Sequence, residues 1–254
     1  MTTDAREVAQ ATEARPGPLP GGDERLAGYG VMGLPFASGH YLALRRFPAN
    51  PFGAPYTSVW HRDPGGSWTF FNSAAPEASC PRFFGAAVDT VVRTPITLDW
   101  PTSSRLEVSD GPLRWSMELS TTPATAAMTA MSRWMPPSAW ESSAVLAAMS
   151  RFVRPVLSAG RIRLTGSVPN GQWFRAAPRV LFAVADSTAS LDGVDLGPLG
   201  PLPRQTRLGD FWLPQRGLFM VGGTVLEAFD PARHHAPRPA IDLAGTSAPN
   251  GGAR

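Results

Sequence analysis

The sequence contains no lysine and only one cysteine. All 23 basic residues are arginine, and Cys80 is the single thiol of the 254-residue chain. Without a lysine amine, the chain cannot form a Schiff base with pyridoxal phosphate or serve as a lysine-dependent aldolase or decarboxylase. It also cannot supply the lysine of a phosphate-binding P-loop. A lone cysteine excludes an intrachain disulfide and a multi-cysteine zinc site.

Histidine is scarce as well. Of four histidines, only His40 and His61 lie in the region that we expect to fold, and no HxxxH pattern is present. The adjacent pair His234 and His235 follows in a proline-rich segment, where we expect it to be solvated. Two histidines without a cluster of carboxylates do not make a zinc site. We therefore predict neither a metal ion nor another cofactor.

Long apolar runs are also missing. A membrane-spanning helix needs roughly 20 consecutive apolar residues, and no stretch of this sequence approaches that length. The segment Met1–Ala14 mixes charged residues with alanines and has no apolar region of the kind found in a signal peptide. We expect a cytoplasmic protein without a membrane span.

The charge distribution does not favour nucleic-acid binding. The formal net charge is +3, and no run of arginines is longer than the pair Arg45 and Arg46. A surface that follows a phosphate backbone usually carries a denser basic stripe. We predict no nucleic-acid partner.

Composition divides the chain into one folded region and two tails. Residues 1–25 and 230–254 are polar and rich in proline and glycine, which is typical of flexible segments. The intervening residues 26–229 belong to a chain with 43% hydrophobic residues, enough for a substantial core. We predict a single domain over 26–229.

Most of this domain shows the alternation of apolar and polar residues that is typical of β-strands. In Tyr56–Phe71, Trp60 and His61 lie on opposite faces of a strand, and the Asp63–Gly66 turn leads into a returning strand. Asp110-Gly111 and Asn170-Gly171 are further turn signals. The glycine-rich segment Gly28–Gly33 lacks the context and spacing of a dinucleotide-binding loop, and we interpret it as a loop or an edge strand.

The exception is a helical stretch, Thr122–Leu157. Thr122 can cap a first helix that carries Met128 and Met131 on one face, and Pro136-Pro137 must interrupt it. Ser138 and Glu141 match a capping box, which would begin a second helix. The sequence therefore predicts a mainly β fold, as an antiparallel β-barrel or a two-module β structure, with an inserted helical hairpin at about 122–157.

Meandering strands with tight turns and one helical excursion resemble the calycin type of β-barrel, which includes lipocalins and carotenoid hydratase-like proteins. The Trp60–Phe70 hairpin and the Gly160–Gly166 segment before the Asn170-Gly171 turn carry this resemblance. It implies a pocket for a lipophilic small molecule. The pattern is also similar to the cone-shaped barrel of acetoacetate decarboxylase-like proteins, and the missing lysine would imply a member without that chemistry.

A few residues could carry chemistry. His61 could act as a general acid or base because its ordinary pKa is near neutrality. Asp210 is a second proton-transfer candidate, and the nearby Arg216 could hold a ligand carboxylate or carbonyl. Cys80 is either a reactive thiolate or, more commonly, a small buried side chain. Aromatic side chains that could line a cavity for a hydrophobic ligand are Trp60, Trp115, Trp134, Trp140 and Trp212.

Two hypotheses follow from the sequence. In the first, the protein binds a lipophilic small molecule, with or without cofactor-free acid–base chemistry of the hydratase, isomerase or cyclase type. In the second, it is a non-catalytic structural or interaction module in which Met128, Met131 and Trp134 form a partner surface, for example in a homodimer. Methionine suits both a lid over an apolar pocket and an interface.

Overall fold

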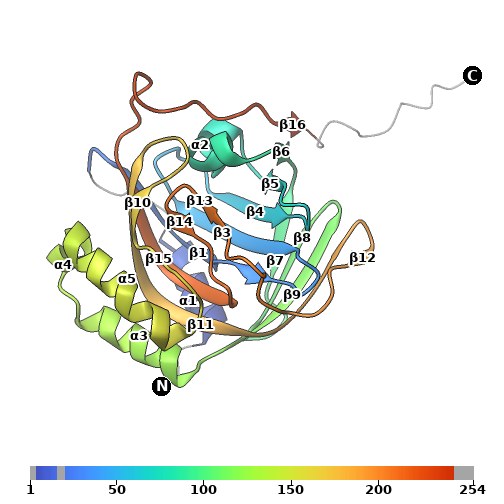
Figure 1. The fold of residues 1–254 in the computed structure, drawn as a ribbon, viewed down its shortest axis with the longest axis horizontal. Coiled ribbons are helices and arrows are strands. Elements are labelled where there is room, and N and C mark those ends of the chain that lie inside the picture. Colours follow the sequence, from blue (N-terminus) through green and yellow to red (C-terminus); the bar gives the residue numbers. More distant parts are fainter. Residues whose placement is uncertain (1–3, 16–20, 243–254) are drawn as a thin grey trace, which may run out of the picture.

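The computed structural model describes residues 4–15 and 21–242 and has a mainly β fold with few helices (Figure 1). Its large sheet contains β1 (Glu24–Val31), β2 (Leu34–Pro35), β3 (Tyr41–Ala49), β4 (Tyr56–Arg62), β5 (Trp68–Asn72), β6 (Thr90–Arg93), β7 (Ile96–Asp99), β8 (Arg105–Asp110), β9 (Leu113–Ser120), β10 (Thr165–Ser167), β11 (Trp173–Leu191), β12 (Val194–Asp195), β15 (Leu218–Leu226) and β16 (Ile241–Asp242). A separate hairpin joins β13 (Arg207–Leu208) to β14 (Phe211–Trp212).

The large sheet is antiparallel except at one end. Its strands follow the order β16-β6-β5-β4-β3-β1-β15-β11-β9-β8-β7, with β2, β10 and β12 paired alongside. The pairs β5–β6 and β6–β16 are parallel, which the sequence did not predict. The predicted hairpin of β4 and β5 is confirmed, with Trp60 opposite Phe70.

The glycine-rich segment lies at the centre of this sheet. β1 pairs with β3 on one side and with β15 on the other, so the prediction of a loop or edge strand was wrong. A Cβ at Gly28 would come within 1.9 Å of the Arg46 carbonyl oxygen, and one at Gly30 within 2.0 Å of the Leu44 carbonyl oxygen. Glycine is needed here because the backbone of β3 approaches too closely for a side chain.

The helical insertion is confirmed, with three helices in place of two. They are α3 (Pro123–Trp134), α4 (Pro137–Glu141) and α5 (Ser143–Leu157), and Figure 1 shows them together on one side of the molecule, next to β11. Thr122 caps α3 as predicted. The predicted capping box at Ser138 and Glu141 does not form. α4 starts at Pro137, two residues before the start that a cap at Ser138 would give, and Ser142 caps α5 instead.

A further helix, α1 (Ala5–Glu13), corrects the prediction that residues 1–25 form a flexible tail. Its Glu13 carboxylate accepts hydrogen bonds from Arg46 Nε at 2.8 Å and from the Tyr29 hydroxyl at 2.9 Å. Ala5 and Ala9 are buried in the core. These contacts come from residues distant in sequence, which is why tail composition alone did not predict them. Residues 1–3 and 16–20 lie outside the described residues.

The C-terminal segment also packs on the domain, up to the last described residue. His234 is buried, and its Nε2 lies 3.0 Å from a carboxylate oxygen of Glu227. The backbone N–H of Asp230 donates to His234 Nδ1. The prediction of a solvated histidine pair was therefore wrong for His234, because its ring has two local partners. Residues 243–254 lie outside the described residues.

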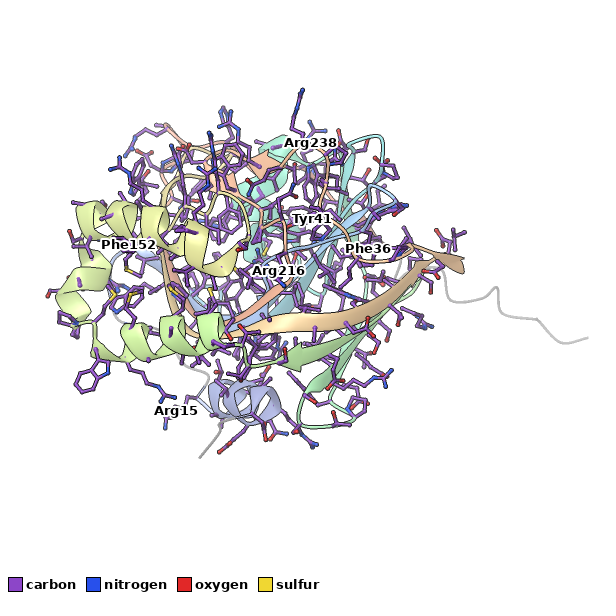
Figure 2. All side chains as sticks on the ribbon, turned by 60° about the horizontal axis from the view of Figure 1, so that its bottom comes forward. Arg15, Phe36, Tyr41, Phe152, Arg216 and Arg238 are labelled. Atoms are coloured by element: carbon purple, nitrogen blue, oxygen red, sulfur yellow. The ribbon has the colours of Figure 1, made fainter. Side chains whose placement is uncertain are left out.

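The central strands are buried on both faces. One face of β3 and β4, with Leu42, Leu44 and Val59, packs against β8, β9 and the second half of β11. The other face, with Tyr41 and Trp60, packs against the short helix α2 (Pro81–Phe84), α4, α5 and the loops around β13 and β14. Short 3₁₀ turns flank α2 at Pro76–Ala78 and Gly85–Ala87. In Figure 2, Tyr41 lies inside the molecule, whereas Phe152 lies on the helical insertion.

The predicted Asp110-Gly111 turn joins β8 to β9 and buries a carboxyl group. Asp110 Oδ1 accepts from the backbone N–H of Leu113 at 3.3 Å, while Oδ2 is buried with no partner in the part of the chain that the structure describes. Burial raises the pKa of Asp110 to about 6. Because its folded-state pKa lies above the ordinary value, the ionised form costs stability above pH 6, and this cost vanishes as the pH falls to 4.

We predict that Asp110→Asn raises the free energy of unfolding by about 1–3 kcal/mol at pH 8, since each unit of pKa shift corresponds to about 1.4 kcal/mol. The gain should shrink towards zero at pH 4, where the native carboxyl is protonated. Urea unfolding at the two pH values measures it, with the exposed Asp99→Asn as control. An equal effect at both pH values would contradict this explanation.

Candidate functional site

An apolar cavity of about 110 Å³ lies between the Trp60 face of the sheet and the helical insertion. An apolar cavity of about 150 Å³ can hold a benzene molecule, so this one is close to the size of a small hydrocarbon group. Side chains of the sheet that line it include Leu26, Phe174, Ala176 and Leu226. Its interior is thus almost entirely hydrocarbon.

The helices α3 and α5 form part of the cavity wall. Met128 of α3 and Val153 and Leu157 of α5 face the cavity, together with Leu164 from the segment before β10. The Leu164 N–H donates to the Ser150 hydroxyl at 3.0 Å, which fastens α5 to that segment. The proposal that the methionine-bearing insertion covers an apolar pocket agrees with this arrangement.

A buried charged side chain, Arg45, lies in this hydrocarbon environment, whereas Arg163, which also lines the cavity, is exposed. β3 places Tyr41, Ala43 and Phe47 on its cavity-side face, and the alternation places Arg45 there too. Arg45 is only 4% exposed. Burial lowers its pKa to about 10, which still leaves the guanidinium positively charged at pH 7.

Backbone carbonyls hold the Arg45 guanidinium. Nη1 donates to the carbonyls of Val31 and Leu44 at 2.6 and 2.8 Å, and Nη2 donates to that of Met32 at 3.1 Å. A guanidinium has five N–H groups, so these bonds use three of them. Among residues 4–15 and 21–242, no carboxylate forms an ion pair with Arg45. The cavity therefore contains a cation that can still donate to a ligand.

Aromatic rings fix the position of Arg45. Its Cζ lies 4.6 Å from the centre of the Trp60 ring and 5.7 Å from that of Phe211. Trp60 is held in turn by a hydrogen bond from its Nε1 to the Ser58 hydroxyl, which donates to Asn72 Oδ1. Such cation–π contacts are strongest where water is excluded. The network leaves Arg45 little freedom to move.

Cys80 and Tyr56 are the neighbouring polar groups of the cavity. The Tyr56 hydroxyl lies 3.9 Å from Cys80 Sγ, and both residues are buried. Burial raises the pKa of the thiol and raises that of the phenol well above its usual value, although Arg45 acts in the opposite direction on both. At neutral pH they are uncharged. The interpretation of Cys80 as a small buried side chain is confirmed.

The predicted proton-transfer residues lie outside this cavity lining. His61 is on the opposite face of β4, with its Nε2 3.0 Å from His40 Nδ1, and burial lowers its pKa to about 4. Asp210 accepts from Arg163 Nη1 at 2.6 Å and from the Ser167 hydroxyl at 3.2 Å. Arg216 is exposed at the surface.

The predicted ligand-binding tryptophans are spread over the molecule. Trp212 lines the cavity. Trp60 is not among the lining residues, but its ring packs against the guanidinium of Arg45, which is. Trp115 belongs to the core on the other face of the sheet, where its Nε1 donates to Ser187. Trp134 is 88% exposed. Trp140 is buried beneath the guanidinium of Arg179, 4.5 Å from its ring centre.

Sequence reasoning missed Arg45, although a signal was present. A charged residue at the third position of an alternation Tyr41, Ala43, Arg45, Phe47 occupies a place where the pattern requires an apolar side chain. As one of the pair Arg45 and Arg46, it stands out by its charge, but only its place in the alternation assigns it to a face of the strand. A charge on an otherwise apolar face of a strand is a pointer to a site.

The described residues place limits on other sites. Within 4–15 and 21–242, no group of three or more His, Cys, Asp or Glu side chains is arranged to hold a metal ion. None of the helices in these ranges is long and apolar enough to cross a membrane.

Comparisons with known proteins give little further guidance. No protein-family model matches the sequence, and no curated protein matches it. Among solved structures, the chain is similar to the acetoacetate decarboxylase of Legionella pneumophila, with 11% identity and a TM-score of 0.36 over 91% of this chain and 96% of that one. Similarity at this level assigns neither a fold family nor an activity.

We predict that Cys80 reacts slowly with the thiol reagent DTNB in the native protein, because it is buried and protonated. The rate at pH 8 should be about 100-fold below that of the urea-unfolded chain, since the thiolate is the reacting form. Cys80 is the only cysteine, so one spectroscopic signal reports it, and Cys80→Ala supplies the blank. Native and unfolded rates that agree would contradict the burial of this thiol.

Proposed function

We propose that the protein binds a lipophilic small molecule in the cavity and that Arg45 holds a carbonyl or carboxylate group of this ligand. The observation that carries the proposal is a buried guanidinium, without a carboxylate partner among the described residues, inside an apolar cavity. Ligand sites are commonly apolar pockets with a few well-placed polar groups. Arginine is suited to this task because its N–H groups can bind a carboxylate through two parallel hydrogen bonds.

The cavity supports binding better than acid–base catalysis. General acid–base catalysis requires a group whose pKa lies near the working pH. The described residues that line the cavity include no histidine, aspartate or glutamate. Glu24 contributes to the electrostatic environment of Tyr56, but its carboxylate accepts hydrogen bonds from Arg82 and Gln172. A hydratase, isomerase or cyclase reaction would need His61 or Asp210 to reach the ligand from outside the lining.

We predict that octanoate binds at least about 10-fold more tightly than octanol, because a hydrogen bond to a charged group is worth about 1.5–3 kcal/mol. Isothermal titration calorimetry of the wild-type protein with the two compounds measures this difference. Arg45→Met should remove the advantage of the acid. Equal affinities in the wild-type protein would contradict the role of Arg45, whatever the variant does.

The site itself is tested by filling it. Ala176→Leu adds hydrocarbon inside the cavity and should weaken both octanoate and octanol by at least about 10-fold, since it occupies the ligand's space. Ala126→Leu makes the same change on an exposed position of α3 and should leave both affinities unaltered. The cavity is not the binding site if neither compound responds to Ala176→Leu.

A second candidate function is an interaction module that uses the helical insertion as its interface, most simply in a homodimer. It is supported by large apolar side chains on the outer surface of α3 and α5, where Trp134 is 88% and Phe152 is 74% exposed. Large exposed apolar side chains of this kind are a feature of interaction sites where they form a contiguous patch.

If the insertion mediates a homodimer, sedimentation velocity should show a concentration-dependent dimer that Trp134→Ser and Phe152→Ser each weaken. Val194→Ser, which removes an exposed apolar side chain from β12, serves as the matched control. A protein that stays monomeric at all concentrations rules out this second function and leaves the first untouched.

A further inference from the structure

A second depression, which we call the arginine groove, adjoins the cavity. It has a volume of about 750 Å³ and runs between α5, the segment before β10 and the β13–β14 hairpin. Its charged side chains are all arginines: Arg151, Arg154, Arg161, Arg163 and Arg207. The whole chain carries a net charge of only +3, so positive charge is concentrated here.

Most of this charge is not neutralised within the protein. Arg163 forms an ion pair with Asp210 at 2.6 Å. In the described part of the chain, the other four arginines of the groove form no ion pair, and all five are exposed. Like charges gathered in one depression repel one another and raise the local positive potential. An anion bound among them would relieve this repulsion.

Aromatic side chains give the groove a defined surface. The Arg161 Cζ lies 5.1 Å and the Arg207 Cζ 5.5 Å from the centre of the Trp212 ring. Gln205 fixes the backbone of Arg161 by accepting from its N–H and donating to its carbonyl. Two guanidinium groups are therefore held at one ring, which is the kind of fixed arrangement that recognises phosphate oxygens.

The groove and the apolar cavity are adjacent and share part of their walls. Ile162, Arg163 and Trp212 line both of them. A ligand that passes between these shared side chains would place its hydrocarbon part in the cavity and its remaining part in the groove. An anion held by several arginines is best matched by phosphate, which offers more acceptor oxygens than a carboxylate.

We propose that the arginine groove binds the phosphate or diphosphate part of an amphiphilic ligand whose hydrocarbon part occupies the cavity. This inference rests on the proposed function, because it extends the same ligand out of the cavity. It names the ligand class as a phosphorylated amphiphile. In this arrangement Arg45 binds a carbonyl or carboxylate group of the ligand inside the cavity, and the groove arginines bind its phosphate outside the cavity.

The experiment compares octyl phosphate, octanol and inorganic pyrophosphate by calorimetry with the wild-type protein and three variants. We predict that octyl phosphate binds at least about 10-fold more tightly than octanol, since charge-assisted hydrogen bonds are about twice as strong as neutral ones. The double variant Arg161→Gln/Arg207→Gln should lose this advantage and keep its affinity for octanol. Arg133→Gln, an exposed arginine of α3 outside the groove, should behave as the wild type does.

The outcomes separate the two proposals. If octyl phosphate has no advantage over octanol, or keeps it in the double variant, the groove is not the phosphate site, while the response of octanol to Ala176→Leu still tests the cavity. If pyrophosphate binds as tightly as octyl phosphate, the groove is a site for free phosphate, and the proposal of an amphiphilic ligand is wrong. If neither octanol nor octyl phosphate responds to Ala176→Leu, the proposed function itself fails.

Discussion

The burial of the Arg45 cation is the constraint around which the cavity side of this protein is organised. Moving an unpaired charge out of water is costly, and proteins normally offset the cost with a carboxylate partner. Here the compensation comes from three backbone carbonyls and the face of Trp60. Two of these carbonyls, those of Val31 and Met32, lie where β1 ends. The end of a central strand therefore also holds the guanidinium of Arg45 in place.

That support depends on close packing of the central strands. Gly28 and Gly30 let β1 approach β3, which brings the end of β1 beside the guanidinium. The opposite face of β3 and β4 is filled by the second core, with Trp115, Met117 and Phe219, so the strands cannot shift in that direction. The apolar cavity lies on the other side of these strands. The packed core on one face of the central strands thus supports the face that borders the cavity.

Much of this architecture could be predicted from the sequence because it follows from local patterns. Alternating strands, the turns at Asp63–Gly66 and Asp110-Gly111, and the capped helix after Thr122 all use signals within a few residues. The helix α1 had such a signal too, since Asp4 accepts from the N–H of Glu7 as a cap, but the composition of the tail obscured it. The central position of β1 and the parallel pairs of β6 depend on contacts between distant segments, which no local pattern encodes.

The candidate site was harder to predict, for a related reason. Residue type alone pointed to His61, Asp210 and the tryptophans. Their roles depend on which face of the sheet they occupy and on what covers that face. Trp134 and Trp140 lie close together in sequence, yet one is exposed and the other is buried under Arg179. Arg45 would have been found by asking which residue breaks the apolar face of its strand.

The same reasoning links the cavity to the insertion that covers it. α3 and α5 contribute apolar side chains to the cavity wall, but a small number of polar contacts tie them to the sheet. Ser132 donates to the Pro178 carbonyl, and the Leu181 N–H donates to Thr129. Helices held mainly by apolar contacts with a partly empty space gain less from packing than helices over a filled core. A ligand that fills the cavity would supply the missing contacts, so occupancy and closure of the insertion should reinforce each other.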